Sequence, residues 1–201
     1  MIVVGVDPGK QGALVALDSQ RDVEVLPTPL IAAGKGGRDE YDLVAVAAWL
    51  RKVAPGFVVV EKSQPLPAFL GKVRRCPVCK SVGGDKPMGG TIAQYARGVA
   101  RGWEWMLIAM EIRYQLVAPR TWQNVMHAGV PTGTTKQRSI VAARRLFPDQ
   151  SLLRTPKCRT LDDGIADALL LADYGHRLLG NDREEPDPCN GLPDVVDDDD
   201  W

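Results

Sequence analysis

The stretch Met1-Ile-Val-Val-Gly-Val-Asp-Pro-Gly9 decides the fold of this chain. Its apolar, β-forming residues run directly into one carboxylate, Asp7, and Pro8-Gly9 ends the strand immediately afterwards. Burying an unpaired charge costs free energy, so an acid held at the end of a core strand indicates a metal or phosphate site. Asp also caps turns without any further role. From this stretch alone, both interpretations stay open.

The length and composition are those of one globular domain. The chain has 201 residues, of which 45% are hydrophobic, and this is enough to bury a core. No apolar run approaches the roughly 20 residues that cross a bilayer. The start lacks the features of a signal peptide, and four cysteines are too few for a disulfide framework. We therefore expect a cytoplasmic protein without a membrane partner.

The formal net charge of zero conceals an uneven distribution. Residues 181–201 contain nine acidic residues and one basic residue, which leaves 24 basic against 16 acidic residues, or +8, in residues 1–180. A basic body with an acidic tail is typical of a nucleic-acid binder. We expect residues 1–180 to form the domain and residues 181–201 to form a disordered tail.

The next segments predict strands, a loop and a helix. Gly12–Leu17 and Val23–Pro27 are expected to continue an antiparallel meander, and residues 28–38 to form a loop. Asp39 is a candidate N-cap for a helix that ends at Pro55-Gly56.

A second apolar run, Phe57-Val-Val-Val-Glu61, also ends in an acid. Continuous apolar runs are expected of central strands that are covered on both faces. Because open α/β sheets place their sites at the carboxyl ends of strands, the second acid favours a functional site over coincidence.

Residues 62–90 form a long, irregular segment rich in Pro and Gly, and loops of this length are functional or disordered. The segment contains Cys76-Pro-Val-Cys79, which is half of a typical zinc site. A dimer partner, Cys158 or His127 could complete a Zn²⁺ site, or the pair could be two ordinary thiols, which is the favoured alternative. The basic residues of the segment 62–90 are Lys62, Lys72, Arg74, Arg75, Lys80 and Lys86.

The middle of the chain predicts a long helix over Thr91–Arg113, capped by Thr91, and then a strand over Tyr114–Pro119. The apolar stripe of this helix indicates core or a dimer interface. A further helix is expected from near Thr135 through Phe147.

Lys136 lies in the first turn of that helix, close to a glycine-rich stretch. Two Thr residues separate Gly133 from Lys136, so the stretch fails as a nucleotide-binding phosphate loop. A cation at a helix N-terminus opposes the helix dipole, which makes a role facing phosphate attractive. A solvated surface lysine is an equally open interpretation.

A final apolar helix carries paired acids. Thr160 is the candidate cap, and Asp163 stands where the acid of a capping box would be. Asp163 and Asp167 are four residues apart, about 40° around a helix, and share one face, whereas Asp162 projects elsewhere. Two such carboxylates repel each other unless a cation lies between them, and this favours a metal site.

Asp7, Glu61, Asp163 and Asp167 together make a set of hard oxygen ligands. Such ligands suit Mg²⁺ or Mn²⁺, and two ions roughly 3.5–4 Å apart can drive phosphodiester hydrolysis. No Ser-His-Asp or Cys-His arrangement surrounds either histidine.

Four motifs resemble a RuvC-type Holliday junction resolvase, and the phage-encoded branch in particular. The resemblance spans residues 1–180 and includes all four acids in order. It implies an α/β, RNase H-like fold with a mixed five-stranded sheet flanked by helices. It also implies a homodimer that nicks opposing strands of a four-way DNA junction during recombination and repair. The motifs are Gly5-Val-Asp-Pro-Gly9, Val58-Val-Val-Glu61-Lys62, Lys136-x-Arg-Ser and Asp163-Gly-Ile-Ala-Asp167-Ala-Leu.

Carried over by position, the resemblance makes the four acids metal ligands and catalytic groups, with two Mg²⁺ or Mn²⁺ ions per site. Lys136 would contact the scissile phosphate, and Arg138 and the basic residues after Glu61 would bind DNA. In the bacterial enzymes the last two acids lie three residues apart. Here that position is Gly164, so Asp163, or less readily Asp162, must serve. The cysteine insert is also unlike the usual junction-probing loop.

Three other functions are compatible with parts of this pattern. One is a less selective RNase H-like nuclease acting on branched DNA, flaps or RNA–DNA hybrids. Another is a non-catalytic junction-binding protein, which the complete set of four acids disfavours. A sugar-kinase or actin-like ATPase would need a second phosphate loop and a longer chain, so no nucleotide cofactor is expected. If the protein is phage-encoded, its compartment is the host cytoplasm.

Overall fold

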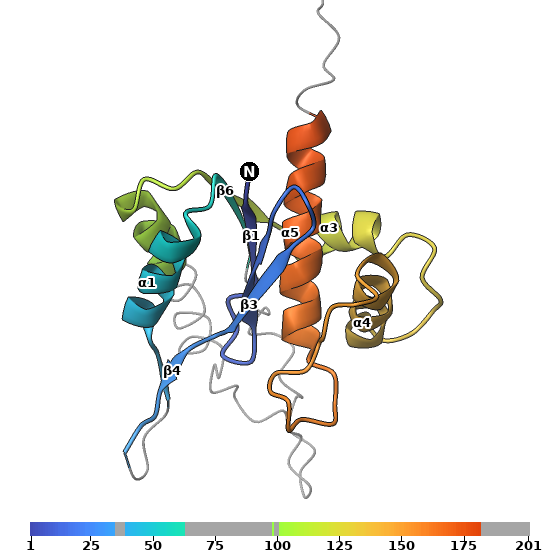
Figure 1. The fold of residues 1–201 in the computed structure, drawn as a ribbon, viewed down its shortest axis with the longest axis horizontal. Helices are drawn as coiled ribbons and strands as arrows, with labels where there is room; N and C mark the ends of the chain where they lie inside the picture. Colours follow the sequence, from blue (N-terminus) through green and yellow to red (C-terminus); the bar gives the residue numbers. More distant parts are fainter. Residues whose placement is uncertain (35–38, 63–97, 99–100, 182–201) are drawn as a thin grey trace, which may run out of the picture.

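The computed structural model describes residues 1–34, 39–62, 98 and 101–181, and a mixed five-stranded sheet lies at its centre (Figure 1). The strand order is β3-β2-β1-β6-β7. The first three strands pair antiparallel, while β6 lies parallel to β1 and β7 lies parallel to β6. This confirms the predicted fold class. The strands are β1 (Val3–Val6), β2 (Ala13–Leu17), β3 (Val23–Pro27), β6 (Phe57–Glu61) and β7 (Tyr114–Val117).

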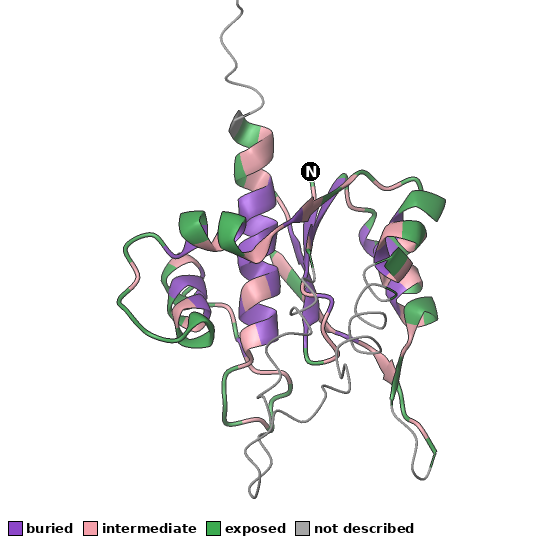
Figure 2. Cartoon of the chain, turned by 180° about the vertical axis from the view of Figure 1, so that it is seen from behind, coloured by how far each residue is buried: buried purple, intermediate pink, exposed green. Residues whose placement is uncertain are grey.

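Helices cover both faces of the sheet (Figure 1). Helix α1 (Leu43–Val53) and the helical residues 101–109 pack on one face through Leu50, Trp103 and Leu107. On the other face lie α3 (Pro119–Met126), α4 (Thr135–Leu146) and α5 (Asp163–Asn181). Figure 2 shows the buried residues concentrated in the sheet and on the helix surfaces that face it. A sheet covered on both faces explains why its central strands are continuous apolar runs.

Helix α5 packs directly on β1 because two glycines remove side chains from the contact. A Cβ atom on Gly5 would lie 2.0 Å from the carbonyl oxygen of Ala168 and 2.4 Å from the amide nitrogen of Ala172. On the helix side, a Cβ atom on Gly175 would lie 2.7 Å from methyl groups of both Val3 and Val59. Backbone-to-backbone packing of this kind fixes the height of α5 above the sheet, and with it the position of the acids at its start.

The structure corrects the predicted loop at residues 28–38 and the cap of the first helix. Leu30–Ile31 (β4) pairs with Glu40–Tyr41 (β5) as a separate two-stranded sheet. The N-cap of α1 is Asp42, which accepts a hydrogen bond from the Ala45 amide at 2.9 Å. Asp39 lies within the hairpin instead, where it accepts a hydrogen bond from the Ala33 amide at 3.1 Å. Asp39 and Asp42 are both residue types that cap helices, and the pairing of β4 with β5 decides which of them caps α1.

Three further boundaries differ from the predictions. Pro119 does not end a strand but opens α3, a helix that the sequence analysis missed, because Pro is favoured in the first turn of a helix. Gly98 and residues 101–109 form the described part of the long central helix, which ends before Arg113, while Thr91 lies outside the described residues. Helix α5 begins at Asp163, and Asp162 rather than Thr160 caps it by accepting from the Ile165 amide at 3.0 Å.

Within the described ranges, none of the helices combines the length and the apolar composition of a membrane span.

Candidate active site

Two acids meet at one end of the sheet because of the strand register. Val6 of β1 is the direct partner of Val60 of β6, and the two strands are parallel. The next residue along each strand is an acid, Asp7 on one and Glu61 on the other. The parallel register therefore brings together two carboxylates that are separated by more than fifty residues of chain.

A tight backbone turn holds the Asp7 carboxylate. The Gly9 amide donates a hydrogen bond to Asp7 Oδ1 at 3.1 Å, and the backbone of Gly12 passes directly beside the carboxylate. A Cβ atom on Gly12 would lie 2.7 Å from Asp7 Cγ, so no larger residue fits there. Burial raises the pKa of Asp7, and repulsion from Asp163 adds to the rise, while the Gly9 hydrogen bond opposes it.

Glu61 is held from the side by Trp122, a fully buried residue of α3. The indole Nε1–H donates to Glu61 Oε1 at 3.4 Å, which is a long hydrogen bond. Burial and, to a smaller extent, repulsion from the neighbouring Asp7 raise the pKa of Glu61 to about 7, although the indole hydrogen bond acts in the opposite direction. Close to neutral pH, the protonated and ionised forms of Glu61 are therefore both populated.

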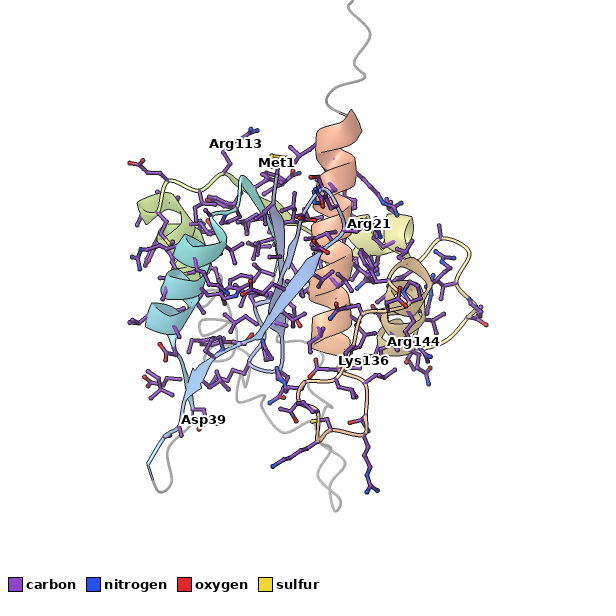
Figure 3. All side chains as sticks on the ribbon, viewed as in Figure 1. Met1, Arg21, Asp39, Arg113, Lys136 and Arg144 are labelled. Atoms are coloured by element: carbon purple, nitrogen blue, oxygen red, sulfur yellow. The ribbon has the colours of Figure 1, made fainter. Side chains whose placement is uncertain are left out.

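The N-terminus of α5 brings two more acids to the same end. Asp163 forms an ion pair with Lys136 of α4, with 2.7 Å between Nζ and Oδ2. This contact raises the pKa of Lys136, and the more distant Asp167 and Asp7 contribute in the same direction. The Lys136 side chain is 75% exposed, so its ammonium lies at the mouth of the site, near the lower end of α5 in Figure 3.

Asp167 lies deeper than Asp163 and has one oxygen without a partner. Burial, together with repulsion from Glu61, Asp7 and Asp163, raises the pKa of Asp167 to about 8. A hydrogen bond with Ser139 of α4 opposes it, and Oδ1 is buried without a hydrogen-bond partner. Leaving a buried acceptor unpaired costs about 1–3 kcal/mol, so this oxygen is suited to a ligand that can bind it.

A second layer of buried side chains supports these acids. His127 Nε2 lies 3.0 Å from Ser139 Oγ, and both residues are almost completely buried. The His127 ring also packs edge-on against Trp122, with 5.6 Å between ring centroids. His127 is therefore linked through Trp122 to Glu61 and through Ser139 to Asp167. The sequence analysis assigned no role to Trp122 or Ser139, although Trp122 and Met126 have the spacing of a buried helix face.

Both oxygens of Asp162 are held by partners outside the set of four acids, although its charge still acts on Asp7. Its Oδ2 accepts from Arg154 Nε at 3.1 Å, while Arg154 also donates to the carbonyl oxygen of Gly12 at 2.8 Å. Arg154 thereby joins the start of α5 to the turn that follows Asp7. It is another residue that sequence reasoning missed, because its partners are 8 and 142 positions away.

The side chains of the four acids are chemically suited to bind a hard cation, although the described residues do not surround a metal position. Carboxylate oxygens are the ligands that Mg²⁺ and Mn²⁺ prefer, and Asp167 Oδ1 has no other partner among the described residues that would compete with a metal ion. Across the part of the chain that the structure describes, no group of three or more His, Cys, Asp or Glu side chains is arranged to hold a metal ion. The ammonium of Lys136 supplies a positive charge to Asp163 in this structure.

The other predicted site residues are divided between the described and undescribed parts of the chain. Lys62 is exposed directly after β6. Arg138 is half-buried and donates to the carbonyl oxygen of His127 at 3.4 Å, so part of its guanidinium faces the protein rather than solvent. Cys158 is a free thiol. The remaining predicted zinc and DNA-binding residues lie outside the described residues: Cys76, Cys79, Lys72, Arg74, Arg75 and Lys80.

These raised pKa values predict that the cation-free protein loses stability as the pH rises. Between about pH 4 and 8, Glu61 and Asp167 bind more protons in the folded state than in the unfolded state, so the free energy of unfolding falls across this range. Urea denaturation at a series of pH values in the presence of EDTA measures the slope. Asp167→Asn should reduce it, and a flat profile for the wild-type protein would contradict the burial of these acids.

Comparison with known proteins supports the fold. No protein-family model and no curated protein sequence matches this chain. Among solved structures, T. thermophilus RuvC in complex with a Holliday junction substrate aligns with a TM-score of 0.50 and 15% identity, over 89% of this chain and 96% of that one. A second Thermus thermophilus RuvC structure aligns with a TM-score of 0.46 and 15% identity, over 88% and 96% of the two chains. The chain therefore has a RuvC-like fold of the RNase H-like class.

Proposed function

We propose that this protein is a metal-dependent, structure-selective DNA endonuclease that resolves four-way junctions by paired nicks. The observation that carries the proposal is the meeting of Asp7, Glu61, Asp163 and Asp167 with Lys136 at one end of a RuvC-like sheet. The comparison structure is described as RuvC bound to a Holliday junction substrate, which agrees with this function. The motifs of the sequence also favour the phage-encoded branch of these resolvases, whose members would act in the host cytoplasm.

The four acids would hold two Mg²⁺ or Mn²⁺ ions. When bound, such ions supply Lewis acidity that generates a nucleophile from water and stabilises the leaving oxygen. The raised pKa values of Glu61 and Asp167 support this role, because a divalent cation removes the repulsion and desolvation cost that raise them. Each of these two carboxyls would release its proton when its oxygens bind the cation.

The structure favours Asp163 over Asp162 as the third acid. Both oxygens of Asp162 have partners, since Oδ1 caps α5 and Oδ2 pairs with Arg154. Both residues act electrostatically on Asp7, but only Asp163 also acts on Asp167, and its partner is the exposed Lys136. Lys136 would exchange this contact for a non-bridging oxygen of the scissile phosphate, where an ammonium stabilises developing negative charge.

A homodimer would match the two-fold symmetry of the junction and place two such sites on opposing strands. Trp105 and Ile108 support this proposal, because both are large apolar side chains that are more than half exposed on the helical residues 101–109. Exposed apolar side chains three residues apart on one helix are suited to pack against a second copy. Analytical ultracentrifugation of the wild-type protein and Trp105→Ser tests this arrangement.

A panel of DNA substrates tests the function directly. Four-way junctions, flaps, RNA–DNA hybrids and duplexes are incubated with Mg²⁺, Mn²⁺ or EDTA, and the products are resolved on denaturing gels. We expect symmetric nicks in the junction alone, with none in EDTA. Cleavage of flaps or hybrids at equal rates would favour the less selective nuclease instead. Junction binding without cleavage under any metal condition would contradict an enzymatic role.

A further inference from the structure

The loop between α4 and α5 carries basic side chains that the site described above does not use. Among the loop residues 150–161 there is no acidic residue, whereas Arg154, Lys157 and Arg159 are basic. Lys157 and Arg159 are exposed, and neither makes an ion pair or hydrogen bond to any described residue. By contrast, Arg154 is half-buried and fully engaged with Asp162 and Gly12. The loop therefore exposes the charged side chains of Lys157 and Arg159, whereas the Arg154 side chain is used in contacts within the protein.

This loop is an ordered part of the structure and is fixed at several points. Its two ends are joined by a hydrogen bond from the Asp162 amide to the carbonyl oxygen of Leu152 at 2.8 Å, and the Leu152 side chain is buried in the core. Within the loop, the Cys158 amide donates to the carbonyl oxygen of Thr155 at 3.0 Å, which closes a turn around Lys157. A fixed loop loses little conformational entropy when it binds a ligand.

The same contacts place the loop beside the four acids. Arg154 donates a hydrogen bond to the carbonyl oxygen of Gly12, whose backbone lies against the Asp7 carboxylate. Asp162 ends the loop and is followed immediately by Asp163, the acid that Lys136 contacts. In Figure 1 the loop lies at the lower end of α5, which is the end at which Figure 3 labels Lys136.

We propose that the loop from Leu152 to Asp162 binds the DNA backbone beside the catalytic acids, with Lys157 and Arg159 as contacts to phosphates that flank the cleaved bond. This inference rests on the proposed nuclease function. The four acids repel DNA, so cations fixed next to them are needed to hold a polyanion close enough to react. Exposed Lys and Arg side chains without internal partners can neutralise phosphates at no loss of ion pairs within the protein, and phosphate contacts fix the register of the protein on DNA.

Salt-dependent binding of a four-way junction tests the loop. We measure the dissociation constant of the full-length protein in Ca²⁺ over a series of salt concentrations, because Ca²⁺ commonly replaces Mg²⁺ as a ligand without supporting hydrolysis. Lys157→Ala combined with Arg159→Ala should weaken junction binding about 10-fold near 0.1 M salt and reduce the slope of log K against log salt by about 2. Circular dichroism and thermal unfolding confirm that the variant is folded.

The matched control removes two exposed arginines elsewhere. Arg51→Ala combined with Arg113→Ala makes the same change in charge, on α1 and at the opposite end of the molecule from Lys136 (Figure 3). We expect this variant to keep the wild-type slope. If both double variants lost the same affinity, the effect would be one of net charge, and the proposed contact would be wrong. No binding of the junction by the wild-type protein would instead overturn the proposed function.

Methylphosphonate substitution locates the contact. Neutralising the phosphates immediately next to the cleaved bond should weaken binding of the wild-type protein, with little further effect on the Lys157/Arg159 double variant, because the interaction is already absent. Equal weakening of both proteins would overturn the assignment of these phosphates to the loop. Coupling between the two changes is the quantity that this double-mutant cycle measures.

Discussion

Replacing Asp167 by Asn is expected to reduce junction cleavage by on the order of 10³-fold or more while leaving the protein folded and able to bind the junction. Asp167 supplies the buried, unpartnered oxygen of the site, and the amide of Asn is a poor ligand for a divalent cation beside three carboxylates. Removing one negative charge also reduces repulsion of DNA phosphates. Single-turnover cleavage and gel-shift binding of the same junction give the two readouts.

The stability of this variant separates a catalytic from a structural role. Because burial and repulsion raise the pKa of Asp167 to about 8, its ionisation opposes folding, and Asp167→Asn should be as stable as the wild-type protein or more stable at pH 8. Asp173→Asn is the matched control on the same helix. The Asp173 carboxylate is buried but pairs with Arg21 and Arg177, which are both half-exposed, so its loss should cost about 1–2 kcal/mol and leave the acids in place. If Asp167→Asn were destabilised to the same extent, Asp167 would be structural.

Replacing Gly5 by Ala is expected to destabilise the fold by about 3 kcal/mol or more. The added Cβ atom would lie 2.0 Å from the carbonyl oxygen of Ala168 and 2.4 Å from the amide nitrogen of Ala172. Both are backbone atoms of α5, so the whole helix must move away from β1 to relieve the overlap. Because α5 carries Asp163 and Asp167, cleavage should fall together with stability.

Gly102→Ala is the control for this effect. Gly102 lies in the helical residues 101–109, and a Cβ atom there would meet no described residue within 4 Å beyond its chain neighbours and the backbone of its own helix. Ala is favoured over Gly in a helix by up to about 1 kcal/mol, so this variant should be unchanged or slightly more stable. Thermal and urea denaturation of the two variants give the comparison. A wild-type midpoint for Gly5→Ala would mean that α5 does not pack on β1 as described.

Much of the fold follows from local sequence patterns. The strands at Val3–Val6, Val23–Pro27 and Phe57–Glu61 were predicted within one residue, because buried runs of β-branched residues have few other stable conformations. The errors lie where two local signals compete. Asp39 and Asp42 are equally good caps, and Pro119 both ends a strand and opens a helix. Such competition is decided by pairing with distant residues, which a local pattern does not contain.

The sequence by itself predicted the four acids and the lysine as site residues, because Asp7 and Glu61 each end an apolar run and Asp167 lies within one, where burial makes a charge costly. Only the tertiary structure decided how these residues are held. The register of β1 on β6 places Asp7 beside Glu61, and Gly5 with Gly175 sets α5 close to the sheet. Contacts that join distant parts of the chain, such as Trp122 with Glu61 and Arg154 with Gly12, depend on the packing of whole elements and leave no local pattern in the sequence.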